Sequence, residues 1–208
     1  MSKAGKKRAD IEALMATYSE HVSANYPGPA RFRDNLARML AAKKEQLSPE
    51  AYVDSLESNL VFLVDLVTEG EAYLELVLGR VNDGGLTSAE IAGTIEEMEG
   101  RVRASTARRR EELLDPQAGG ELAGLTALRE GGGGEYVEKL EFNYIYYMAM
   151  RLLLFEFFNV LAAVREEYTV QRVDEAAFDH VRIHVEMTVN YLLGNISVGE
   201  IVPETGPS

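Results

Sequence analysis

The chain lacks cysteine entirely, and that absence removes several classes of protein at once. A disulfide-linked scaffold, a thiolate zinc site, an iron–sulfur cluster and a cysteine nucleophile all require the thiol group. The N-terminus also lacks an unbroken apolar segment, because the basic stretch "MSKAGKKRAD" runs into the mixed stretch "IEALMATYSEHV". That pattern is not typical of a secretory signal. We therefore expect a cytoplasmic, or otherwise intracellular, soluble protein.

A membrane-spanning segment is not expected either. The most apolar stretch, residues 142–164, contains the polar residues Asn143, Arg151, Glu156 and Asn159. Ionised side chains are costly at the centre of a bilayer. We therefore expect no membrane among the partners.

Basic residues are scarce, with 21 Lys and Arg against 34 Asp and Glu, so the formal net charge is −13. An acidic surface repels nucleic acid and anionic membranes. One basic island interrupts it at residues 101–110, with Arg101, Arg103, Arg108, Arg109 and Arg110. These arginines spread around a helix and have acidic neighbours, which indicates surface ion pairs. Nucleic acid is expected at most locally, through Arg101–Arg110.

Strand-like alternation is also missing, since apolar residues recur at spacings of three and four. This pattern predicts an all-α protein. The expected helices span residues 8–25, 30–47, 49–81, 88–114, 135–170 and 174–194, with a short helix at 122–129. The stretch "SPEA" marks one helix start, with Ser48 as the N-cap and Pro49 in the first turn.

One stretch of the sequence, which we call the repeated line, occurs twice in similar form. "AYVDSLESNLVFLV" begins at residue 51, and "EYVEKLEFNYIYYM" begins at residue 135, which is 84 positions later (135 − 51). Tyr52, Leu56 and Glu57 recur as Tyr136, Leu140 and Glu141. A second helix follows each copy. The pattern predicts a duplicated helical hairpin, with the two copies related by a pseudo-two-fold axis; the alternative is chance similarity between two amphipathic helices.

The expected fold is a long up-down helical bundle, made of two pseudo-symmetric hairpins and an N-terminal helical pair. Its expected parts are the helical pair at 1–47, the first hairpin at 48–115, a Gly-rich linker at 116–134, the second hairpin at 135–195 and a flexible or extended tail at 196–208, forming one compact domain overall. The helix at 135–170 is apolar nearly all round, which predicts a central position. We expect the helix at 49–81 to lie on the outside, with one face in solvent. That face carries Asp54, Glu57, Val61, Asp65, Thr68, Ala72 and Glu75.

A metal site is the sharpest chemical hypothesis. Ferritin-like bundles bind two metal ions through Glu residues and Glu-x-x-His motifs on four helices. The candidate ligands in this chain are Glu57, Glu141, His180 and His184, a set that suits Fe, Mn or Zn. However, the chain contains no Glu-x-x-His motif. Such a bundle, acting as a metal-dependent enzyme or a storage protein, is therefore the alternative hypothesis.

The main hypothesis is a non-enzymatic assembly or adaptor protein. Aromatic residues crowd the helix at 135–170, and aromatic residues are enriched at protein–protein interfaces. One bundle rarely covers a helix that is apolar on so many sides, so we expect a second copy of the chain, or another protein, to cover the rest. The expected interface residues are Tyr144, Tyr146, Tyr147 and Phe157. No catalytic residue and no cofactor is expected. Such proteins occur in multi-subunit assemblies, viral and phage particles included.

Overall fold

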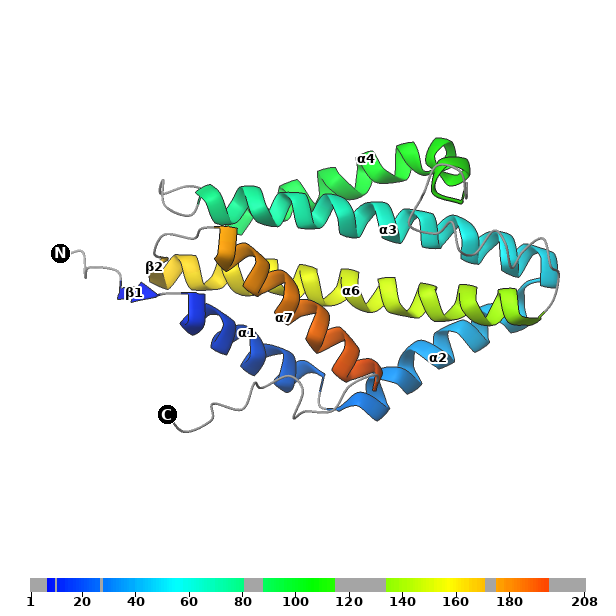
Figure 1. Cartoon of the computed structure of the whole chain (residues 1–208), viewed down its shortest axis with the longest axis horizontal. Helices are drawn as coiled ribbons and strands as arrows, with labels where there is room; N and C mark the ends of the chain where they lie inside the picture. Colours follow the sequence, from blue (N-terminus) through cyan, green and yellow to red (C-terminus); the bar gives the residue numbers. More distant parts are fainter. Residues whose placement is uncertain are drawn as a thin grey trace.

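The structure is a computed structural model that describes residues 7–9, 11–26, 28–80, 88–114, 134–170 and 175–194. Six helices account for nearly all of these ranges. They are α1 (Ile11–Asn25), α2 (Pro29–Gln46), α3 (Pro49–Arg80), α4 (Ser88–Leu114), α6 (Gly134–Glu167) and α7 (Glu175–Leu193). The all-α helical bundle expected from the sequence is confirmed (Figure 1).

The residues that mark the start of α3 in the sequence form the expected capping contact. The Ser48 hydroxyl accepts a hydrogen bond from the backbone N–H of Ala51 at 3.2 Å, so Ser48 is the N-cap of α3. The helix α6 already begins at Gly134, a position that the sequence pattern assigns to the linker. The rest of that linker, the short helix expected at 122–129 and the tail at 196–208 lie outside the described residues.

Two short strands, which the sequence pattern does not predict, join the N-terminal segment to the end of α6. The strand β1 (Lys7–Ala9) pairs in parallel with β2 (Tyr168–Val170), with Lys7 opposite Tyr168. Residues 8–9 and 168–170, expected at the ends of helices, are therefore extended. The ladder holds the start of α1 beside the end of α6 (Figure 1).

The centre of the bundle is the pair α3 and α6, which lie side by side and run in the same direction (Figure 1). Near their starts, Tyr52 of α3 contacts Glu141 of α6. Farther along, a Cβ built on Gly70 would lie 2.8 Å from Cδ2 of Leu154. A side chain at this position would require the Leu154 side chain to shift, so Gly70 permits the close approach of the two helices at this level.

The other helices surround this pair. The helix α4 packs on α3, while α1 and α7 pack on α6 (Figure 1). On α1, Leu14 and Tyr18 are fully buried, and the Tyr18 hydroxyl donates to the backbone carbonyl of Leu153 at 3.0 Å. The helix α1 is therefore part of the core.

The expectation of a solvated stripe on α3 is correct for Asp54, Thr68, Ala72 and Glu75, which are exposed, and wrong for Glu57, Val61 and Asp65. Glu57 and Asp65 are each only 1% exposed, and nearly every residue from Leu60 to Val67 is buried. The reason is that α3 is covered by α4 on one side and by α6 on another, so α3 is as central as α6. The acidic residues of α3 indicated an outer helix. At Glu57, however, a tyrosine of α6 donates a hydrogen bond to the buried carboxylate.

Among the described residues, one helix segment, Gly134–Val164 of α6, is long and apolar enough to cross a membrane. Of its most apolar window, 56% is buried inside the chain. Core helices of bundles meet the same criteria of length and composition, so this is weak support for a membrane span.

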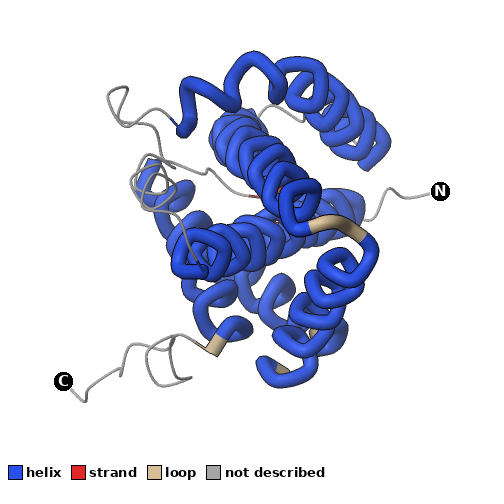
Figure 2. The backbone as a smooth tube through the Cα atoms, turned by 90° about the vertical axis from the view of Figure 1, so that its right-hand side faces the viewer, coloured by secondary structure: helices blue, strands red, loops and turns tan. Residues whose placement is uncertain are grey.

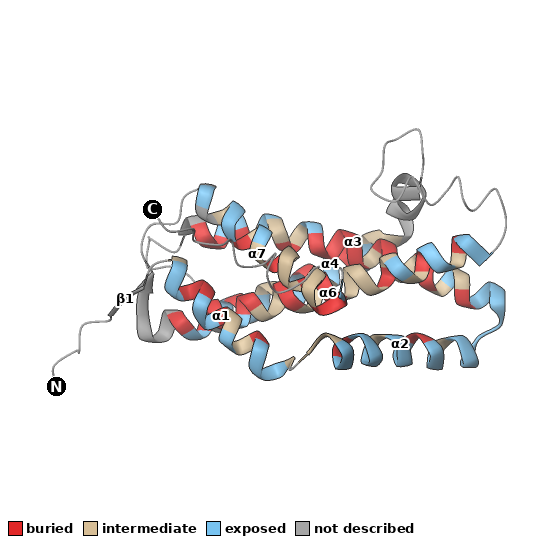
Figure 3. Cartoon of the chain, turned by 60° about the horizontal axis from the view of Figure 1, so that its bottom comes forward, coloured by how far each residue is buried: buried red, intermediate tan, exposed pale blue. Residues whose placement is uncertain are grey.

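The helix α2 differs from the others because most of its surface is exposed (Figure 3). Only Phe32 and Leu40 are buried along its 18 residues. It is also basic, with Arg31, Arg33, Arg38, Lys43 and Lys44 against Asp34 and Glu45. A basic, exposed helix therefore lies on the outside of an acidic protein.

Candidate functional site

The starts of α3 and α6 are joined by two reciprocal tyrosine–glutamate hydrogen bonds. The Tyr52 hydroxyl donates to Oε1 of Glu141 at 2.8 Å, and the Tyr136 hydroxyl donates to Oε1 of Glu57 at 2.6 Å. Tyr52 and Tyr136 are equivalent in the repeated line, as are Glu57 and Glu141. Each copy of the line therefore donates to the other through the same two residue types.

These bonds lie beside a pocket where α2 ends and α3 and α6 begin, the end of the molecule that faces the viewer in Figure 2. We call it the mouth pocket; its volume is about 350 Å³. Its lining residues are Lys44, Leu47, Pro49, Tyr52, Val53, Gly134, Val137, Glu138 and Glu141. Apolar side chains make up most of the wall, while Lys44 and Glu138 supply opposite charges.

Phe142 is an exposed aromatic residue one helical turn beyond Glu138. Its side chain is 54% exposed, the largest exposed fraction among the large apolar residues of the described ranges. Residues four apart lie on the same helix face, so Phe142 follows the pocket residue Glu138 along the surface of α6. An exposed apolar side chain and an apolar pocket are therefore neighbours on one surface.

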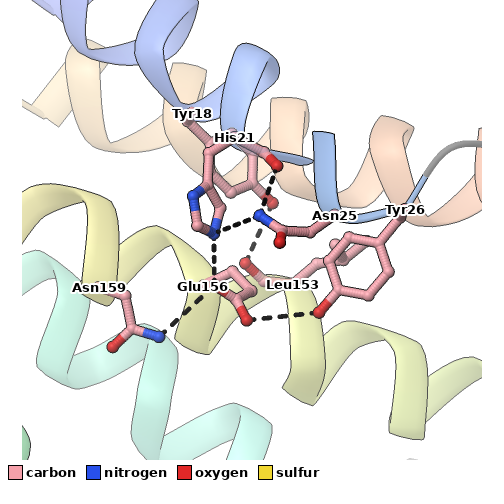
Figure 4. Close-up of polar contacts among 7 residues, drawn as sticks. All are labelled: Tyr18, His21, Asn25, Tyr26, Leu153, Glu156 and Asn159. Atoms are coloured by element: carbon pink, nitrogen blue, oxygen red, sulfur yellow. Dashed lines mark hydrogen bonds and ion pairs between the residues drawn. The ribbon is translucent and has the colours of Figure 1, made fainter. Parts of the chain in front are cut away.

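A second polar cluster surrounds Glu156 of α6 (Figure 4). Nε2 of His21 lies 2.7 Å from Oε2 of Glu156, and the Tyr26 hydroxyl donates to Oε1 of Glu156 at 3.3 Å. Burial, followed by the charge of Glu156, raises the pKa of Tyr26 to about 12. The cluster fastens the end of α1 to the middle of α6 through charge-assisted hydrogen bonds.

His184 on α7 completes the contacts of α1. Its Nε2 lies 3.1 Å from the Ser19 hydroxyl, and its ring meets that of Tyr18 edge-on at 6.2 Å. Burial, and then the neighbouring His180, lower the pKa of His184, while Glu12 acts in the opposite direction. The neutral imidazole is therefore the form that suits this helix contact.

The four expected metal ligands do not come together. Glu57 accepts a hydrogen bond from the Tyr136 hydroxyl of α6. The ring of His184 meets the ring of Tyr18, and that ring packs on Phe157 of α6. Tyr136 and Phe157 lie about 30 Å apart along α6, as calculated from the rise per residue of an α-helix. Glu141 is instead tied to Tyr52 and Lys44, and the ring of His180 lies beside that of His184. Across the described ranges, no group of three or more Asp, Glu or His side chains could hold a metal ion.

Two of the four expected interface residues lie inside the chain. Phe157 is fully buried against Tyr18, and Tyr144 is only 5% exposed, with Nζ of Lys43 over its ring. Tyr146 and Tyr147 are half-buried and meet edge-on at 5.5 Å. Burial, and then the charge of Glu186 on α7, raise the pKa of Tyr146 to about 12. The five other helices of the same chain thus cover much of the surface that suggested a partner.

The arginines of the basic island that the structure describes make contacts within the chain. Arg101 pairs with Glu97 at 3.1 Å and with Glu69 at 3.6 Å. The guanidinium of Arg103 lies over the ring of Phe62 at 4.9 Å. The side chains of Arg108, Arg109 and Arg110 lie outside the described part of the chain.

In comparisons with known proteins, no family model, no curated protein and no solved structure matched the chain. Function is therefore argued from its own geometry. Sequence reasoning missed Phe142 and the mouth pocket. The available signal was a phenylalanine between Glu141 and Asn143 in the repeated line, where the first copy has Ser58.

Proposed function

We propose that the protein is a non-enzymatic assembly protein that associates with a second copy of itself through the mouth pocket and Phe142. The observation that carries this proposal is the exposed phenylalanine beside an apolar pocket on the same surface. In a two-fold dimer the same patch meets itself, so each Phe142 enters the pocket of the other copy. A buried aromatic anchor is the usual centre of such an interface.

The charges around the pocket support the same arrangement. Lys44 lines one part of the wall, with its side chain 62% exposed, and the exposed Glu138 lines another. A two-fold axis between the copies brings Lys44 of one copy towards Glu138 of its partner. Complementary charges at the rim favour the correct register of two copies.

We also infer that the two hairpins arose by duplication. Gly70 and Leu154, which meet in the core, occupy equivalent positions 84 residues apart. The reciprocal bonds between Tyr52 and Glu141 and between Tyr136 and Glu57 are the contacts that a two-fold relation between α3 and α6 requires. Chance similarity of two amphipathic helices does not require matched partners on both sides.

Light scattering on size-exclusion fractions of the full chain tests the association. We expect the mass of a dimer for the wild type and the mass of a monomer for Phe142→Ser. Ile183→Ser is the matched control, since Ile183 on α7 is 47% exposed and lies away from the pocket. A monomeric wild type at the highest soluble concentration, or equal effects of the two variants, would refute the proposal.

The ferritin-like alternative has no comparable support. It needs Glu57, Glu141, His180 and His184 in one site, and their contacts place them in separate parts of the bundle. A native mass spectrum recorded without chelator tests it directly. One or two transition-metal ions per chain, lost in Glu141→Gln, would favour that alternative over the assembly protein.

A further inference from the structure

A second pocket, which we call the corner pocket, lies where the chain turns from α1 into α2. Its volume is about 330 Å³, within the range of small-molecule sites. Tyr26 and Phe32 form an aromatic wall, with ring centres 5.7 Å apart and planes nearly perpendicular. Leu36 of α2 and Leu152 of α6 supply apolar surface. Such walls suit a flat, apolar ring.

The polar groups of this pocket are few and differ in what they already bind. The Tyr26 hydroxyl is engaged with Glu156, and the amide of Asn25 donates to the backbone carbonyl of His21. Arg31, in contrast, is exposed and makes no ion pair with any residue in the described ranges. Its guanidinium is therefore available to a ligand.

The charge of Arg31 selects the sign of that ligand. A guanidinium binds a carboxylate through two parallel hydrogen bonds, and it holds its charge at every physiological pH. The surrounding helix is basic, so an anion approaches α2 more favourably than it approaches the rest of this acidic chain. The pocket thus combines a place for an aromatic ring with one cation at its edge.

We propose that the corner pocket binds a small aromatic carboxylate, with its ring against Tyr26 and Phe32 and its carboxylate on Arg31. This site is separate from the mouth pocket, and its occupancy does not depend on self-association. Benzoate and 4-hydroxybenzoate are suitable probes of this ligand class.

Titration of the isotope-labelled full chain with benzoate, followed by NMR, tests the proposal. We expect saturable shifts at Tyr26, Phe32 and Leu36, and an affinity at least tenfold lower in Arg31→Gln. Arg33→Gln is the matched control, because it removes the same charge from α2 at a residue that does not line the pocket. Benzyl alcohol, which lacks the carboxylate, should bind at least tenfold more weakly than benzoate.

A second variant tests the pocket without changing its charge. Gly28 lines the pocket, has an extended backbone with φ of 164°, and has no heavy atom within 4 Å of a built Cβ. Gly28→Leu is therefore expected to fold, as checked by circular dichroism, and to weaken benzoate binding. The absence of saturable shifts in the wild type, equal losses in Arg31→Gln and Arg33→Gln, or equal binding of benzyl alcohol would each overturn the proposal.

Discussion

Single hydrogen bonds between side chains hold the central helices in register. Glu57 is 1% exposed and accepts from Tyr136, whereas Glu141 keeps 26% of its side chain exposed and also pairs with Lys44. The two bonds are equivalent in sequence but unequal in burial. A buried carboxylate depends more on its donor, because water cannot replace it.

Tyr136→Phe is therefore expected to cost about 1.5–3 kcal/mol of unfolding free energy, as typical for a hydrogen bond to a charged group. Tyr52→Phe, the matched control, is expected to cost less than about 1 kcal/mol, because Glu141 retains water and Lys44. Urea unfolding followed by circular dichroism measures both values. Equal costs would show that burial does not distinguish the two bonds.

His184 gives the fold a dependence on pH. Its pKa is lowered in the folded chain by burial and by His180, so the unfolded chain takes up the proton at a higher pH. The stabilisation by neutral His184 is therefore present above its ordinary pKa of 6.5 and is lost as the pH falls below it. The groups around it are Ser19, Tyr18 and Glu12 on α1 and His180 on α7.

We expect the melting temperature of the wild type to fall between about pH 7.5 and about pH 5.5, since histidine titrates in this range. The fall should be smaller in His184→Gln, whose amide keeps a polar group beside Ser19 but does not titrate. His180→Gln should reduce the fall by a smaller amount, because His180 lowers the pKa of His184 less than burial does. An unchanged fall in His184→Gln would contradict the role given to this residue.

At the scale of the helix, Gly70 shows how one residue permits a short packing distance. A methyl group there would meet the buried side chain of Leu154 at 2.8 Å. Alanine would raise helix propensity by about 1 kcal/mol, but overpacking a core costs about 1–3 kcal/mol. The clash therefore outweighs the gain.

Gly70→Ala is expected to destabilise the chain by up to about 2 kcal/mol, the net of these two effects. Gly93→Ala on α4, where a Cβ meets nothing within 4 Å, should stabilise it by about 0.5–1 kcal/mol. Chemical denaturation measures both. In a Leu154→Ala background the cost of Gly70→Ala should disappear; if it persists, the contact with Leu154 is not its cause.

Helix positions could be derived from the sequence because their signals are local. Ser48 and Pro49 mark the start of α3 by their own chemistry, and the structure confirms that start. Burial could not be derived in the same way. Glu57 looks solvated in the sequence until Tyr136, 79 residues away, supplies a donor, so its burial depends on a distant contact. The short pairing of β1 with β2 is also non-local.

The residues of the candidate interface could not be derived from the sequence alone either. Tyr144 and Phe157 are suitable interface residues by type, but packing against α1 and α2 places them inside the chain. Phe142 is two residues from Tyr144 and lies on a face that the other helices do not cover. The choice between them depends on which face of α6 each neighbouring helix takes, and residue types alone do not specify this.

At the scale of the whole molecule, the proposal is that two copies meet at the mouth pocket. The absence of cysteine makes this contact directly measurable, because any disulfide reports only on introduced residues. A disulfide needs Cα atoms within about 7 Å, so it forms only between positions that meet. Lys44 and Glu138 line the pocket, and the proposed two-fold arrangement brings Lys44 of one copy towards Glu138 of its partner while both copies keep Phe142.

The most direct measurement mixes one chain that carries Lys44→Cys with another that carries Glu138→Cys under mild oxidation. Mass spectrometry then quantifies the disulfide-linked pair of the two variants. We predict that this pair forms in clear excess over the pair from Ile183→Cys and Glu138→Cys. A yield no higher than that of the Ile183→Cys control would contradict the proposed assembly surface.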